Sequence, residues 1–127
     1  MVDALPITSV IAVSDLERAR GFYTEKLGLT VTTDNSPEEI FFEAGSGTRV
    51  LLYHRPDHVP ASATIAGFVA ADLSATVADM AARGIQFEDY DFPGLKTDEN
   101  HIAASPGGTR SAWFKDPDGN ILAVGEM

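Results

Sequence analysis

The 127-residue sequence contains no cysteine, which excludes disulfides, thiolate metal sites and cysteine nucleophiles together. It lacks any apolar run near the roughly 18 residues of a membrane span and any secretion signal, so we expect a cytoplasmic protein without a membrane partner. Positive charge is scarce, because 9 Lys and Arg face 19 Asp and Glu, a formal net charge of -10. This acidity argues against a nucleic-acid partner; it either favours a cationic ligand or only keeps the protein soluble.

A well-marked turn stands near the C-terminus of the chain. Pro117-Asp118-Gly119 lies between two apolar runs, which predicts a three-residue hairpin loop with Gly119 at positive φ. Asp116 then lies opposite Asn120. Because side chains alternate along a strand, the two arms separate into an open face and a face that packs on a helix. The open face carries Trp113, Lys115, Ile121 and Ala123, and the helix face carries Phe114, Leu122 and Val124.

The same hairpin occurs earlier in the chain. Residues 41–51 superimpose on residues 113–123 when Gly47 is matched to Gly119, and an internal repeat of this kind decides the fold. We predict an α+β fold for a single domain over residues 1–127, built from two modules of strand, helix and three strands. Module one covers 5–54, a linker covers 55–63, and module two covers 64–127.

Periodicity and end signals place the elements within the modules. Helices are predicted to follow a capping box from Ser14 to Glu17 and to start again at Asp72, and they end at Gly28 and Gly84. Residues 92–108 are too long and polar for an ordinary connection and are expected to form a lid or binding loop. The predicted strands are 7–13, 29–33, 39–44, 49–54, 64–70, 85–91, 109–115 and 120–126. The second helix is expected to turn Leu73, Val77, Met80 and Ala81 inward.

Two stretches resemble the module signatures of the vicinal-oxygen-chelate superfamily, which includes glyoxalase I, extradiol dioxygenases, and fosfomycin and bleomycin resistance proteins. They are Trp113-Phe114-Lys115-Asp116-Pro117-Asp118-Gly119-Asn120 and Ala12-Val13-Ser14-Asp15-Leu16-Glu17-Arg18-Ala19-Arg20-Gly21-Phe22-Tyr23, the latter followed by Leu27-Gly28-Leu29. The resemblance implies two βαβββ modules whose curved sheets enclose a cleft, with helices outside. These motifs are caps and turns, so they indicate fold rather than activity.

Enzymes of this superfamily hold a divalent metal with His, Glu or Gln at four strand positions. The resemblance places those positions at Thr8, Leu51, Ile65 and Ala123. None of these side chains is a plausible ligand, so we expect no metal and no cofactor. The metal-dependent activities of the superfamily are therefore not carried over to this chain.

The expected cleft face is lined by aromatic and small residues. Trp113, Phe41 and Tyr53 suit stacking on a flat or apolar ligand, or they simply fill the cleft floor, and small residues such as Gly67 and Ala123 leave space nearby. Tyr90 is expected to close over the cleft from the loop. The full predicted face consists of Thr8, Val10, Ala12, Phe41, Glu43, Arg49, Leu51, Tyr53, Ile65, Gly67, Val69, Ser111, Trp113, Lys115, Ile121 and Ala123.

Charged residues add two candidates. Glu43 and Arg49 should face each other across the first hairpin, either as a cross-strand ion pair or as a polar anchor for a ligand. His101, in the loop, is either an acid or base or a solvated side chain.

The sequence therefore favours a metal-free protein that binds a small aromatic or cationic molecule, such as an antibiotic that it sequesters. The alternative is an enzyme of the same superfamily, for example a lyase, isomerase or dioxygenase, which uses acid or base residues of the lid or an atypical metal site. Free sheet edges favour a homodimer.

Overall fold

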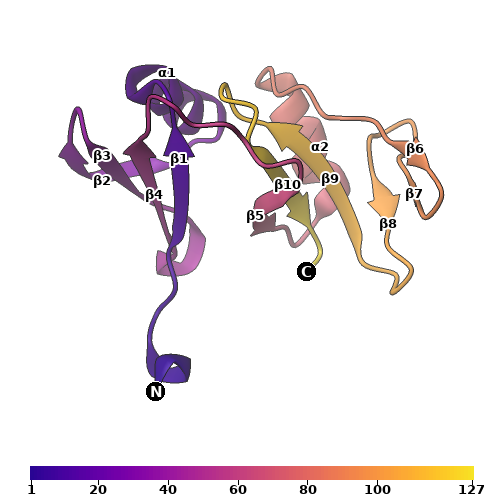
Figure 1. Cartoon of the computed structure of the whole chain (residues 1–127). Coiled ribbons are helices and arrows are strands. Elements are labelled where there is room, and N and C mark those ends of the chain that lie inside the picture. Colours follow the sequence, from indigo (N-terminus) through magenta and orange to yellow (C-terminus); the bar gives the residue numbers. More distant parts are fainter. The chain divides into compact units, whose positions relative to one another are not determined.

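Two four-stranded sheets, each with one α-helix, make up the computed structural model, which describes residues 1–127 (Figure 1). The chain divides into two compact units, Met1–Val59 and Pro60–Met127, and each is described by itself. The α+β class predicted from the sequence is confirmed, as is the order strand, helix and three strands in the first unit. None of the helices has the length and apolar character needed to cross a membrane.

The first unit forms a mixed sheet in the order β1-β4-β3-β2, with β1 parallel to β4 and the other pairs antiparallel. Its helix, α1, continues directly into a π-helical turn, η2. The elements are η1 (Val2–Ala4), β1 (Ser9–Val13), α1 (Leu16–Gly21), η2 (Phe22–Lys26), β2 (Thr30–Asn35), β3 (Glu39–Glu43), η3 (Gly45–Gly47) and β4 (Arg49–His54).

The start of α1 differs by one residue from the prediction. Asp15, not Ser14, is the N-cap, and its side chain accepts a hydrogen bond from the Arg18 amide at 3.0 Å. Aspartate and serine cap helices about equally well, so the sequence did not distinguish the two neighbours. At the other end Gly28 has a φ of 75° and stops the helix, as predicted. The following turn, η2, buries Tyr23 near Phe42 of β3, with ring centroids 6.1 Å apart.

The second unit repeats this plan with a sheet in the order β5-β10-β9-β8. Strand β5 runs parallel to β10, and β9 is antiparallel to both β10 and β8. Strands β6 and β7 form a separate small ribbon. The elements are β5 (Thr64–Val69), α2 (Leu73–Ala82), β6 (Asp91–Phe92), β7 (Leu95–Lys96), β8 (Ala103–Ala104), β9 (Arg110–Lys115) and β10 (Ile121–Gly125).

The hairpin of β9 and β10 has the predicted register. Trp113 pairs with Ala123, and the Asp116 amide donates to the Asn120 carbonyl at 3.0 Å. Gly119 has a φ of 90°. The alternation therefore turns Phe114, with no exposed surface, toward α2 and leaves Trp113 half-buried on the opposite face.

The prediction of a strand over 85–91 is wrong. The fourth strand of the second sheet is β8 instead, and residues near 87 only touch the sheet edge. Phe87 makes one bridge to Phe114, and the Glu88 amide donates to the Trp113 carbonyl at 2.8 Å. The chain then leaves the sheet edge and returns in β8, where Ala103 pairs with Ser111 of β9. We call residues 89–102 the excursion. The physical reason is Pro93-Gly94, which turns the chain back into the β6–β7 ribbon, with Gly94 at a φ of 84°.

The stretch 92–108, expected to form a lid or binding loop, contains the short strands β7 and β8. A smaller correction concerns α2, where Ala81 is exposed while Leu73 and Val77 are buried. Ala81 lies in the last turn of α2, where the buried stripe already ends at the half-buried Met80. The homodimer expected from the sheet edges stays a prediction.

Replacement of Phe114 by alanine should destabilise the protein strongly. This ring is fully buried and packs edge-on against Phe87 at 5.9 Å, so we expect a loss of about 3–5 kcal/mol. Trp113→Ala, on the half-buried face, should cost less despite the larger side chain. Urea unfolding of the two variants measures both values, and a larger loss for Trp113→Ala would contradict the assignment of faces.

A cluster around Asp34, at the end of β2, links stability to pH. The Ser36 hydroxyl donates to Asp34 Oδ1 at 2.6 Å, and the Arg20 guanidinium forms an ion pair with the same carboxylate. These two groups lower the pKa of Asp34 from 3.8 to about 2. Because the folded pKa is lowered, the stabilisation is present above the unfolded value and is lost as the pH falls toward 2.

We therefore expect Asp34→Asn to be less stable than the unmodified protein near neutral pH. The difference should shrink between about pH 4 and pH 2, as Asp34 is protonated in both states. Denaturant unfolding across this range measures it. Asp57→Asn, which removes a single exposed contact to Arg55 at 3.4 Å, is the control and should change little. A stability difference that stays constant down to pH 2 would exclude this role of Asp34.

Candidate functional site

Each sheet has one face under its helix and one open face on which the predicted site residues lie. In the first unit the open face of β3 and β4 carries half-buried Phe41, Leu51 and Tyr53. Phe41 pairs with Leu51 and Glu43 with Arg49, which confirms the predicted register. Thr8, just before β1, is half-buried.

Arg49 does not form the cross-strand ion pair with Glu43 that was one of the two alternatives predicted from the sequence. Its guanidinium lies over the Phe41 ring, 4.9 Å from the centroid, while Glu43 is exposed. Arginine over an aromatic face is a favourable cation–π arrangement. Phe41 therefore presents one face of its ring to a cation already supplied by the chain.

In the second unit the open face is centred on Trp113. The Tyr90 ring meets it edge-on, with centroids 5.6 Å apart and planes at 72°, and Phe92 lies 5.6 Å beyond Tyr90. Partial burial, helped by the Glu88 carboxylate and opposed by Lys115, raises the pKa of the Tyr90 phenol. Ile65 is also on this side, with 41% of its surface exposed, and Val69 is 70% exposed. The excursion thus brings an aromatic neighbour to the predicted anchor.

The space expected beside Gly67 is partly filled. A Cβ built at Gly67 would come within 2.8 Å of the Met127 Cε atom, so this thioether side chain lies over the β5–β10 strands. Ala123, paired with Gly67, is buried. The glycine allows close approach of a side chain of the chain itself, which the sequence prediction did not foresee.

His101 lies on a different side of the second unit from Trp113. Its ring stacks on Phe87, with centroids 6.0 Å apart and planes at 17°, and Phe87 packs against Phe114 on the helix face. Trp113 points to the opposite face, because neighbouring residues of a strand alternate. The structure therefore does not bring His101 and Trp113, two residues of the predicted site, together.

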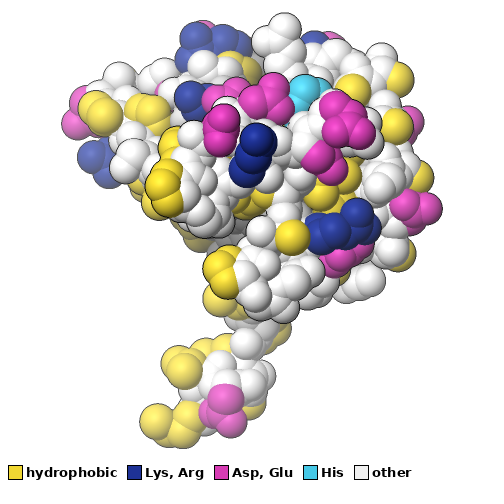
Figure 2. All heavy atoms as spheres, turned by 90° about the vertical axis from the view of Figure 1, so that its right-hand side faces the viewer, with side chains coloured by type: hydrophobic (Ala, Val, Ile, Leu, Met, Phe, Trp, Pro, Cys, Tyr) yellow, Lys and Arg dark blue, Asp and Glu magenta, His cyan; other side chains and the backbone are white.

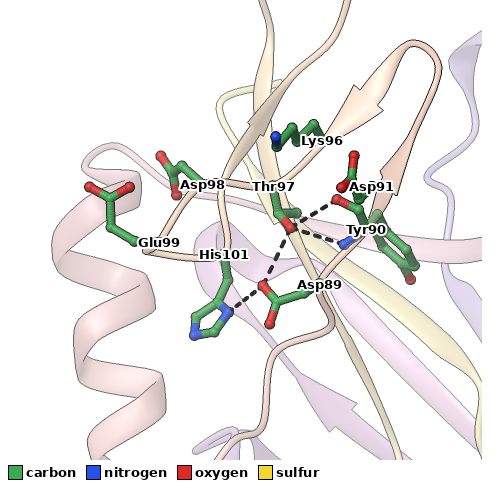
Figure 3. A pocket seen from close by; sticks show the side chains of 8 residues that line it. All are labelled: Asp89, Tyr90, Asp91, Lys96, Thr97, Asp98, Glu99 and His101. Atoms are coloured by element: carbon green, nitrogen blue, oxygen red, sulfur yellow. Dashed lines mark hydrogen bonds and ion pairs between the residues drawn. The ribbon is translucent and has the colours of Figure 1, made fainter.

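His101 belongs instead to a cavity of about 420 Å³ within the excursion (Figure 3). Its Nδ1 lies 2.7 Å from Asp89 Oδ1. The Thr97 hydroxyl accepts from the Tyr90 amide at 2.9 Å and lies 3.3 Å from the same Asp89 oxygen. The remaining lining residues are Asp91, Lys96, Asp98 and Glu99. Sequence reasoning missed Asp89 and Thr97, because neither stands in a periodic segment or at a motif spacing from His101.

The residues at the superfamily's metal positions do not fit a metal. Leu51, Ile65 and Ala123 have no donor atom, and Thr8 offers only a hydroxyl, whereas divalent metals in proteins take imidazole and carboxylate ligands. Elsewhere in the chain, no three histidine, aspartate or glutamate side chains come close enough together to hold an ion. The donor atoms at these four positions therefore do not support metal-dependent chemistry.

Comparisons with known proteins agree with this geometry at the level of the fold. A lactoylglutathione lyase from Agrobacterium tumefaciens is 24% identical with a TM-score of 0.70, over 96% of this chain and 92% of that one. A superfamily member from Sphaerobacter thermophilus is 24% identical with a TM-score of 0.74, over 100% of both chains. A bleomycin resistance determinant encoded on the transposon Tn5 is 19% identical with a TM-score of 0.73, over 94% of this chain and 95% of that one.

None of the curated proteins matches the sequence. The family described as the Glyoxalase/Bleomycin resistance protein/Dioxygenase superfamily matches residues 6–124, which is nearly the whole chain and includes both repeated hairpins. With the two four-stranded mixed sheets, this match shows that the chain belongs to the Glyoxalase/Bleomycin resistance protein/Dioxygenase superfamily.

Proposed function

We propose that this protein binds a small organic ligand, aromatic or cationic, on the open face of its second sheet and without a metal. The observation that carries the proposal is the half-buried Trp113 with Tyr90 edge-on at 5.6 Å. A large aromatic surface that is partly accessible and backed by a rigid sheet suits stacking on a flat molecule. The four metal positions without ligands support a role in binding rather than in metal-dependent chemistry.

Charge supports a cationic or neutral ligand over an anionic one. Lys115, beside Trp113 on the open face, is already engaged by Glu88 at 3.4 Å, and the chain as a whole carries a formal charge of -10. An anion near this face would meet net repulsion. Sequestration of an antibiotic is the corresponding biological role, by analogy with the similar Tn5 bleomycin resistance determinant.

An enzymatic role is the second candidate, and the pair of His101 and Asp89 is the observation that favours it. A carboxylate that orients an imidazole is a common arrangement in acid–base catalysis. This pair lies on the side of Phe87, away from the open face, so it does not act on a ligand stacked on Trp113. The two candidates therefore concern different places in the second unit.

Trp113→Ala should weaken binding of such a ligand by about 1–3 kcal/mol, since loss of a large aromatic anchor usually has this effect. Trp113 is the single tryptophan of the chain, so quenching of its fluorescence identifies ligands that contact this face. Calorimetry then compares the affinities of the variants. Trp113→Phe, which keeps a ring, is the matched control and should retain most of the affinity. Equal affinity in Trp113→Ala would disprove stacking at this residue.

The purified protein should carry no stoichiometric divalent metal. The reason is the chemistry of Thr8, Leu51, Ile65 and Ala123, which supply no imidazole or carboxylate. Metal analysis after dialysis without a chelator provides the measurement, and ligand binding should be unchanged by a chelator. About one ion per chain, removed by chelation together with ligand affinity, would refute the metal-free assignment.

A further inference from the structure

The excursion contains an imidazole that one carboxylate holds in a defined orientation. His101 Nδ1 lies 2.7 Å from Asp89 Oδ1, and Figure 3 shows the two side chains directed toward each other from opposite ends of the excursion. An ionised carboxylate can only accept hydrogen bonds, so Nδ1 must carry the proton that is donated. Whenever the ring is neutral, its lone pair is therefore on Nε2. This second nitrogen makes no hydrogen bond within the chain.

The imidazole is also held in place by the core. Its ring stacks on Phe87, which is 9% exposed and packs against the fully buried Phe114. The His101 backbone has a φ of 68°, a conformation that is uncommon for residues other than glycine. Its amide donates to the Asp98 carbonyl at 3.0 Å, and Asp98 Oδ1 accepts from the Ile102 amide at 3.0 Å. Nε2 is thus an acceptor whose position is fixed before any ligand arrives.

The side chains around Nε2 favour a positively charged ligand. Asp89, Asp91, Asp98 and Glu99 line the cavity with Lys96 as the one cation, and acidic side chains gather around a histidine on the face of the second unit seen in Figure 2. The volume of about 420 Å³ suits a small molecule. A histidine side chain 37% exposed is accessible to it. A ligand that donates an N–H to Nε2 and carries positive charge satisfies both features.

We propose that the excursion is a binding site for a small organic ammonium ion, whose N–H group donates a hydrogen bond to His101 Nε2. Asp89 is the positioning residue, since it selects the ring tautomer that leaves Nε2 free to accept. The neighbouring carboxylates contribute charge. This site goes beyond the proposed ligand face: Tyr90 borders both places, but His101 lies on the side of Phe87 and Trp113 on the opposite face.

The first test is the tautomer. Nitrogen-15 NMR of the imidazole groups at alkaline pH distinguishes a protonated Nδ1 from a protonated Nε2, and His54 and His58 serve as internal references. We expect His101 to carry its proton on Nδ1, and Asp89→Asn to shift it toward Nε2. Asp91→Asn removes the same charge from the lining without a contact to the ring, and it should leave the tautomer unchanged. A proton on Nε2 of His101 in the unmodified protein would overturn the proposal.

The second test uses three probes that share a butyl or propyl chain: butylammonium, butyltrimethylammonium, which has no N–H, and butanoate. Titration is followed on the His101 imidazole signals. Butylammonium should bind, butyltrimethylammonium should bind at least about tenfold more weakly, the usual effect of losing a hydrogen bond to a charged group, and butanoate should not bind. His101→Phe replaces the acceptor by an aromatic ring, so it should lose the preference for butylammonium over butyltrimethylammonium. Asp91→Asn removes one charge from the lining but leaves His101 in place, so it should weaken both cations alike and keep that preference.

Thermal unfolding verifies that each variant is folded. Trp113→Ala should keep the preference for butylammonium over butyltrimethylammonium, because it leaves His101 and Phe87 in place, and this holds whether or not the open face binds its own ligand. Equal affinity for the two cations, or binding that depends on Trp113 and not on His101, would show that the assignment is wrong.

Discussion

The buried pair of Asp116 and Asn120 fixes the register on which the second unit depends. Both residues are nearly inaccessible, at 4% and 1% exposure. Asp116 Oδ1 accepts from the amides of Asp118 and Asn120, each at 3.0 Å, and its Oδ2 accepts from the Asn120 side chain at 2.8 Å. A slip of one residue would break these bonds and exchange the faces of Trp113 and Phe114. Because buried polar groups without partners are costly, the turn allows one pairing of β9 with β10.

This constraint explains why so much of the fold could be predicted. Turn residues and alternation act over a few residues, so the sequence alone predicted the pairing of Trp113 with Ala123 and of Glu43 with Arg49, and both are confirmed. It did not predict that Arg49 would prefer the Phe41 ring or that Met127 would lie over Gly67. These contacts depend on the rotamers of long side chains, which no local pattern specifies.

The excursion is the point at which the two repeated units differ most. In the first unit Val31 pairs with Phe42, one residue is left over, and Thr33 pairs with Phe41. In the second unit Phe87 makes the equivalent bridge to Phe114. Here, however, it is not one residue but the whole excursion, 89–102, that leaves the sheet edge. The one-residue bulge of the first unit and the inserted β6–β7 ribbon of the second unit therefore follow equivalent strand pairs. The sequence predicted a strand over 85–91 and a lid or binding loop over 92–108, so it expected a long connection here but began it three residues too late.

The position of the insertion also explains why Asp89 and Thr97 meet near His101, a grouping that the sequence did not predict. At a sheet edge the chain can leave and return without breaking the central pairs, provided that Phe87 and Ala103 still meet β9. Residues between them are free to pass around the edge, so Tyr90 reaches Trp113 on the open face while His101 stacks on Phe87. The side chains of the excursion can therefore change their chemistry while the turn at Asp116 keeps the register, which separates the part of the second unit that determines the fold from the part that is available for recognition.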